Sequence, residues 1–161
     1  MFNNKKELIF IALAMFFAAD AITAELIGGK LINVFGFTLS IGVIPWPVVF
    51  IASDVINEFY GKTGVRRLSI ITAGLIGYAY LVLWAAMSIH ASSISPISDS
   101  VFAQVFGQST WLILGSLAAF VLSQLVDNSI FWMLRKRTGH SMIWLRSTGS
   151  TVVSQLVDTI V

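Results

Sequence analysis

Acidic and amide side chains recur at three places in this sequence, at a spacing that brings them onto one face of a helix. Residues separated by three or four positions lie above one another on a helix. The candidates are Asp54, Asn57, Glu58, Gln124, Asp127, Asn128, Gln155 and Asp158. Carboxylates accept hydrogen bonds, and amides both accept and donate them. A converging set therefore suits an ammonium group or a flat ligand with an amidine-like edge, such as the N–H groups of a guanine-type base.

The apolar surroundings of these residues make them informative. An ionisable side chain within a membrane span costs about 2.5 to 3.5 kcal/mol, so each one calls for a reason. One reading is that the amides hold helices together. The other is a solute pocket, which we favour because the sequence offers almost no buried basic residue to pair with the carboxylates. Ser123–Asp127 and Ser154–Asp158 have the same sequence, which resembles an internal repeat.

Aromatic residues near the polar positions give the pocket a second candidate function, stacking on a flat ring. Their ordinary alternative is the aromatic belt at a membrane interface. They are Trp46, Phe50, Tyr60 and Trp132. Pro45 and Pro47 lack backbone donors, so they predict a kink or an unwound stretch inside the second apolar segment.

The elements that carry these residues are predicted to be membrane-spanning helices. The chain is 57% hydrophobic and 11% charged, whereas soluble domains carry about 25% charged residues. A span needs about 20 helical residues, and barrel strands are far shorter and alternate. We therefore predict an all-α, polytopic bundle in one transmembrane domain, with five spans visible. They cover about 7–27, 39–60, 66–89, 107–134 and 143–161.

Basic residues predict the orientation of the bundle. They precede the first span and lie between the second and third and between the fourth and fifth spans. These are Lys5, Lys6, Lys62, Arg66, Arg67, Arg135, Lys136, Arg137 and Arg146. Basic residues favour cytoplasmic loops, so alternate loops and the N-terminus are predicted to be cytoplasmic. This use of basic charge also argues against a nucleic acid partner.

Enzymatic sites are not indicated by the sequence. Without cysteine, the chain lacks thiolate ligands for zinc or iron–sulfur clusters. His90 and His140 are isolated, and the run Gly61-Lys62-Thr63 follows Ile56 where a phosphate-binding loop needs glycine. We predict no catalytic residue, metal or cofactor. An intramembrane aspartyl hydrolase is the enzymatic alternative, but its Gly-x-Gly-Asp pattern is missing.

Two stretches carry a resemblance to a known family. They are Ser53–Lys62 followed by Arg66-Arg67, and Trp144–Arg146 followed by Ser147 to Thr159. The chain resembles the queuosine precursor transporters, also known as vitamin uptake transporters, over nearly its whole length. The resemblance implies a six-span protein of the bacterial or archaeal cytoplasmic membrane that imports a 7-deazaguanine base for tRNA modification. The family pattern continues past Val161, so we expect the natural protein to do so and the pocket to be incomplete here.

The resemblance also implies partners and leaves coupling open. The expected partners are the small base and the lipid bilayer, and a homo-oligomer or an energy-coupling protein remains an alternative. The family is similar to substrate-capturing subunits of energy-coupling-factor importers. A capturing or structural subunit of a larger importer is accordingly the second functional hypothesis.

Overall fold

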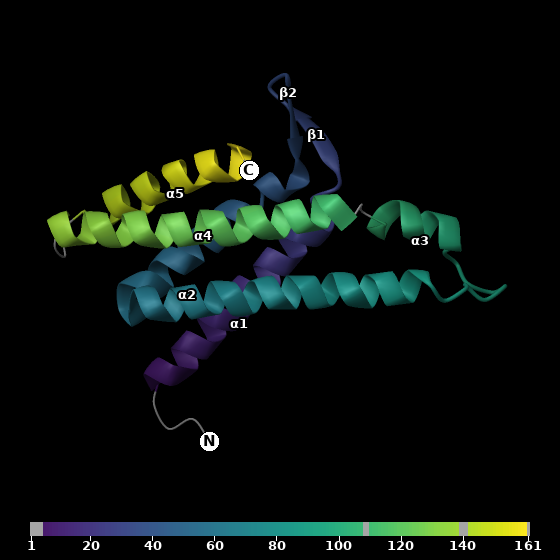
Figure 1. Cartoon of the computed structure of the whole chain (residues 1–161), viewed down its shortest axis with the longest axis horizontal. Coiled ribbons are helices and arrows are strands. Elements are labelled where there is room, and N and C mark those ends of the chain that lie inside the picture. Colours follow the sequence, from purple (N-terminus) through teal and green to yellow (C-terminus); the bar gives the residue numbers. More distant parts are fainter. Residues whose placement is uncertain (1–4, 108–109, 139–141, 161) are drawn as a thin grey trace.

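Helices make up most of the chain, as the composition predicts. The computed structural model describes residues 5–107, 110–138 and 142–160, and within these it describes no side chains at 110–112, 143 and 157–160. The helices are α1 (Lys5–Ile27), α2 (Trp46–Met87), α3 (Asp99–Phe106), α4 (Thr110–Thr138) and α5 (Ile143–Ile160). The hairpin of β1 (Leu31–Val34) and β2 (Phe37–Ser40) precedes a short 3-10 helix, Ile41–Val43. Figure 1 shows α4 beside α5 and α1 crossing behind α2.

Three helical segments of the described residues are long and apolar enough to cross a membrane. They are Lys5–Ile27, Ile41–Met87 and Ile113–Thr138. The all-α, polytopic membrane fold is thereby confirmed. Helix α5, which coincides with the predicted fifth span, is not among these three, and it carries Arg146 and a series of serine and threonine residues.

The predicted second and third spans are two limbs of α2, separated by a single residue. Gly61 has φ 78° and ψ 168°, a conformation outside the helical region that is essentially restricted to glycine. Two helical limbs meet at this kink, and Figure 1 shows α2 turning back on itself. Residues of both limbs belong to one hydrophobic cluster with α1 and α4. The loop predicted at 61–65 is therefore one bend within a continuous element.

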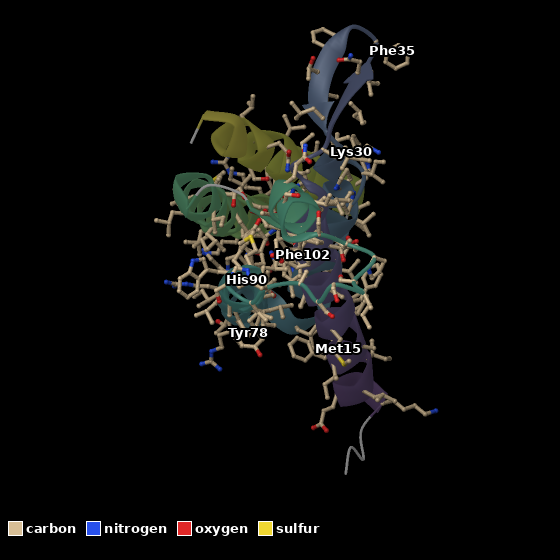
Figure 2. The ribbon with its side chains drawn as sticks, turned by 90° about the vertical axis from the view of Figure 1, so that its right-hand side faces the viewer. Met15, Lys30, Phe35, Tyr78, His90 and Phe102 are labelled. Carbon is tan, nitrogen blue, oxygen red and sulfur yellow. The ribbon has the colours of Figure 1, made fainter. Side chains whose placement is uncertain are left out.

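The predicted span 39–60 starts too early, because its first residues belong to strand β2 of the hairpin. Phe35 and Gly36 have positive φ values of 50° and 86°, as the two-residue turn of a tight hairpin requires. Val34 pairs with Phe37 across the turn and Leu31 with Ser40. Phe35 is 98% exposed at the tip, which points away from the helices (Figure 2).

The kink or unwound stretch predicted at Pro45 and Pro47 is a turn at residues 44–45, between the 3-10 helix and the start of α2. Pro45 is the N-cap, and Pro47 lies in the first turn. The first turn of a helix has no internal partner for its N–H groups, so proline costs nothing there.

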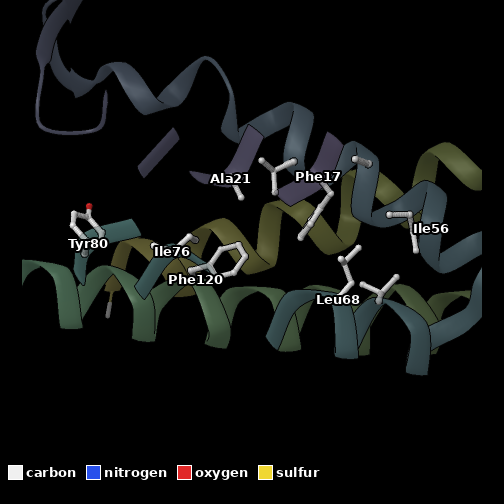
Figure 3. Packing of buried hydrophobic residues seen from close by; sticks show 10 residues of the cluster. Phe17, Ala21, Ile56, Leu68, Ile76, Tyr80 and Phe120 are labelled. Carbon is white, nitrogen blue, oxygen red and sulfur yellow. The ribbon is translucent and has the colours of Figure 1, made fainter. Parts of the chain in front are cut away.

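The hydrophobic core joins α1, both limbs of α2, and α4. Phe17 and Ala21 of α1 meet Ile56 and Leu68 from the two limbs and Phe120 of α4 (Figure 3). Small residues such as Ala21 allow helices to approach closely. The core therefore fixes the limbs of α2 against α4, the two elements that carry most of the predicted site residues.

The outside of the molecule is apolar. Met15, Phe59, Tyr78 and Trp84 each leave more than 60% of their surface uncovered. Soluble monomers rarely expose large apolar side chains in such numbers. Lipid is the solvent that suits this surface, in agreement with a multi-pass membrane protein.

Candidate functional site

Two of the three predicted polar faces meet in the interior. Asp54 and Asn57, from the first limb of α2, are 5% and 0% exposed, and Gln124, Asp127 and Asn128 of α4 are at most 1% exposed. The helical spacing in each sequence explains why these residues share a face. Helix α5 closes the cluster with buried hydroxyls, Ser150 and Ser154.

The carboxyl groups of Asp54 and Asp127 lie against each other and against hydroxyls of α5. Ser147 donates a hydrogen bond to Asp54 Oδ2, and Ser154 Oγ donates to Asp127 Oδ1 over 3.3 Å. Ser150 is buried on the same face of α5, and the two carboxyl groups are close enough to interact electrostatically. A hydrogen bond between two carboxyl groups would require a proton on one of them.

Amide groups form the next part of the cluster. Asn57 Nδ2 donates to Asn128 Oδ1 over 3.2 Å, which joins α2 to α4. Ser69 Oγ, from the second limb of α2, donates to Gln124 Oε1 over 3.2 Å. Both bonds are buried, so the amides are held in fixed orientations.

Several polar atoms of this cluster have no hydrogen-bond partner among the described residues. An unsatisfied buried polar group costs about 1 to 3 kcal/mol. The atoms are Asp54 Oδ1, Asn57 Oδ1, Gln124 Nε2, Asp127 Oδ2 and Asn128 Nδ2. They offer acceptors and donors together, so the cluster can bind a small polar ligand or water.

Glu58 corrects the expectation that the carboxylates lack basic partners. Its carboxylate lies 3.2 Å from Arg146 Nη2 and 3.6 Å from Arg135 Nη2. Arg146 is 0% exposed, and its guanidinium lies 5.5 Å from the centre of the Phe131 ring. This ion-pair cluster of Glu58, Arg135 and Arg146 joins α2, α4 and α5.

Sequence reasoning placed Arg146 in a loop and missed it as a site residue. A signal was present, because Arg146, Ser150 and Ser154 follow one another at four-residue steps and hence share a helical face. All three are buried. The buried face of α5 is therefore this one, adjacent to the predicted Gln155.

Gln155 lines a groove between α5 and the start of α2, and the side chain of Asp158 lies outside the described residues. The groove has a volume of about 470 Å³ and is lined by Pro47, Ile51, Ser147, Thr148, Thr151, Val152, Gln155 and Leu156. A neighbouring hollow of about 370 Å³ shares Pro47, Thr151 and Gln155. Since the hydroxyl of Ser147 reaches Asp54, the groove leads toward the carboxyl pair.

The aromatic candidates separate into two groups. Trp46 and Phe50 line the hollow beside the groove and can face a ligand there. Tyr60 stacks on Phe10, with ring centres 4.8 Å apart, and Trp132 lies under Arg135. These last two have packing partners and do not line either hollow.

A second polar cluster lies at the other end of the helices. Ser116 of α4 donates a hydrogen bond to Glu25 of α1, and Tyr80 OH donates to the same carboxylate over 3.4 Å. These contacts connect α1, α2 and α4. No group of three metal-binding side chains is found in the described part of the chain.

Comparisons with known proteins identify two relatives of this chain. A protein of Bacillus subtilis (strain 168) named "Probable queuosine precursor transporter" is 32% identical over 82% of this chain and 58% of its own length. A protein of Haemophilus influenzae with the same name is 25% identical over 87% of this chain and 57% of its own length. The chain thus spans less than two thirds of the relatives it matches.

No solved structure matches the chain. The family described as "Putative vitamin uptake transporter" matches residues 40–161, a range that holds the carboxyl pair, the amides and the ion-pair cluster. The chain belongs to that family of membrane transporters.

Proposed function

We propose that this protein imports a queuosine precursor, a 7-deazaguanine base, across the cytoplasmic membrane of a bacterium or archaeon. The substrate is the one named for both relatives. The observation that carries the proposal is the set of buried, unpartnered polar atoms on α2 and α4. Their mixture of donors and acceptors is complementary to the edge of a guanine-type base.

Seven of the eight predicted site residues have a role in this proposal. A carboxylate of Asp54 or Asp127 accepts the N1–H and amino hydrogens of the base, and the free amide hydrogens of Gln124 and Asn128 donate to its carbonyl. Gln155 contacts the base on its way through the groove. Glu58 holds the helices in register through the two arginines, and Asp158 is proposed as a further contact.

Transport follows from movement of the helices that carry these groups. The cluster is buried, so the base can reach it only if α5 separates from the first limb of α2. Ser147 of α5 lines the groove and donates a hydrogen bond to Asp54 of α2, so the two helices are in contact there. A transporter exposes such a site alternately to the two sides of the membrane.

The orientation with a cytoplasmic N-terminus belongs to the proposal. Tyr60 OH donates to the carbonyl of Lys6 over 2.8 Å, and Lys62 Nζ donates to Ser129 over 3.3 Å. The basic start of α1, the bend in α2 and the end of α4 therefore share one end of the molecule. Basic residues concentrate on the cytoplasmic side.

The test uses a strain that cannot make the base and depends on its uptake. We expect the changes Asp54→Ala, Asp127→Ala and Asp158→Ala in the full-length protein each to abolish precursor-dependent queuosine in tRNA. The control is Glu7→Gln, an exposed acid in the first turn of α1, which should leave queuosine at the wild-type level. Unchanged queuosine in all three alanine variants, at normal expression, would contradict the proposed site.

A substrate-capturing subunit is the alternative function. Binding and liposome transport of the base by the purified protein distinguish it from an importer. If the purified full-length protein binds the base tightly but moves none into liposomes, the import step requires an energy-coupling partner. If it binds no base, the polar cluster only holds helices together.

A further inference from the structure

Base recognition as proposed uses the carboxylate of one residue of the pair, so the second carboxyl group needs a further explanation. One oxygen of each group, Asp54 Oδ1 and Asp127 Oδ2, has no hydrogen-bond donor among the described residues, whereas the other two oxygens accept serine hydroxyls. Two ionised carboxylates cannot donate to each other. A single proton between them supplies the donor that both groups need.

Charge balance also favours one proton on the carboxyl pair. Among the described residues, the same three helices carry Glu58 on α2, Arg135 on α4 and Arg146 on α5, and both arginines bind Glu58. On α1, the carboxylate of Glu25 is engaged by Ser116 and Tyr80. Among these three described side chains the arginines exceed Glu58 by one positive charge, and one further negative charge nearby would balance it. A carboxyl pair with one proton carries that charge, and an isolated buried charge would be costly.

The proton also links three helices. Asp54 belongs to α2, Asp127 to α4, and the hydroxyls that bind them to α5. Loss of the proton puts two negative charges in contact in a region of low dielectric constant, where they repel strongly. Ionisation therefore favours separation of α2 from α4, and protonation favours the closed arrangement.

We propose that Asp54 and Asp127 form a proton-binding site that carries one proton inward with each molecule of base. An O–H bond forms on one carboxyl group from a proton of the outer solution and breaks when that proton is released to the inner solution. The other carboxylate keeps its negative charge and accepts the N–H groups of the base. The coupling rests on the proposed function, but the proton site itself does not.

The proton is tested first, without transport. Infrared spectroscopy of the purified full-length protein in liposomes at neutral pH should show the carbonyl stretch of a protonated carboxylic acid, shifted in D2O. Asp54→Asn and Asp127→Asn should each lose this band, because the remaining carboxylate then balances the surplus positive charge. Glu7→Gln should keep it.

Two spectroscopic results would overturn the proton site. One is a wild-type protein without the band, including the case in which Na⁺ instead changes the carboxylate stretches, which would indicate a metal cation. The other is a band of wild-type strength in the double variant Asp54→Asn/Asp127→Asn, because it would belong to a different acid.

The coupling is tested with the same liposomes and radiolabelled base. At zero membrane potential, an outside solution more acidic by one pH unit should accumulate the base about tenfold for one proton per base. The Glu7→Gln variant should accumulate it equally. The Asn variants should lose this accumulation.

The outcomes distinguish the proton site from the transport function. Base uptake that ignores the proton gradient would overturn the coupling and leave the proposed function intact. The infrared band without any binding or movement of base would keep the proton site and overturn the proposed function.

Discussion

At the residue scale, Arg146 shows how polar side chains hold this bundle together. It is 0% exposed, it binds Glu58 of α2, and it lies over Phe131 of α4. A guanidinium loses its hydration when it is buried, and here a carboxylate and an aromatic face replace the lost water contacts. Arg146 is thus a structural contact beside the candidate site.

Removal of Arg146 should destabilise the protein more than removal of a nearby exposed arginine. Breaking a buried ion pair from one side costs about 3 to 5 kcal/mol, so we expect Arg146→Ala to lower the unfolding free energy by about 3 kcal/mol. Arg137→Ala, an exposed residue at the end of α4, should change it by less than about 0.5 kcal/mol. Thermal unfolding in detergent measures both, and equal stability of the two variants would contradict the buried ion pair.

The same residue shows what the sequence could and could not reveal about the site. The spacing of Asp54, Asn57, Gln124, Asp127 and Asn128 predicted a shared face, and the structure brings these residues together. Their role in binding stays a prediction. Arg146 was missed because a basic residue next to an apolar segment is ordinarily an interfacial anchor. Only the packing of α5 against α2 and α4 shows that it is inside.

At the scale of elements, Gly61 decides how α2 is used. An unbroken helix of 42 residues would be about 63 Å long at 1.5 Å per residue, twice the thickness of a hydrocarbon core. The bend at Gly61 divides it into two limbs that share the core with α1 and α4. The limb before Gly61 carries Asp54, Asn57 and Glu58, so the bend also positions the site.

Alanine at Gly61 should therefore act through the backbone. No atom lies within 4 Å of an added Cβ, but the φ of 78° and ψ of 168° strain any other residue by about 1 to 3 kcal/mol. We expect Gly61→Ala to lower the unfolding free energy by this amount and to reduce base uptake.

Gly74→Ala is the matched control for this prediction. Gly74 lies within the second limb of α2 and also has open space around its added Cβ, and alanine favours an exposed helix by up to about 1 kcal/mol. The two variants should differ in sign when their thermal unfolding is compared. A Gly61→Ala protein as stable as Gly74→Ala would show that the bend does not need glycine.

The elements also show where sequence patterns fail. Periodicity and length predicted α1, α4 and α5 nearly to their ends, because long apolar runs have few alternatives. The hairpin at 31–40 was missed, since its turn is Phe35-Gly36 instead of the Asn-Gly or Asp-Gly pairs that announce such turns. Pro45 and Pro47 suggested an interior kink because the helix was expected to begin before them.

At the scale of the whole molecule, the distribution of polarity is inverted relative to a soluble protein. Asp54, Asn57 and Asp127 are inside, and Met15 and Trp84 are outside. This arrangement is expected when lipid covers the surface and polar groups can be satisfied only within the bundle. It predicts that the connection after α2 and the bend at Gly61 lie on opposite sides of the membrane, because the second limb of α2 separates them.

Single cysteines can test this topology, since the sequence contains none. Thr63→Cys places a thiol beside the bend, and Ser92→Cys places one in the connection between α2 and α3, both at exposed positions. With the N-terminus in the cytoplasm, a membrane-impermeant maleimide should label Ser92→Cys in intact cells and label Thr63→Cys only after the membrane is opened. Labelling of Thr63→Cys alone in intact cells would indicate the opposite orientation, with the N-terminus outside. Equal labelling of both would mean that the second limb of α2 does not cross the membrane.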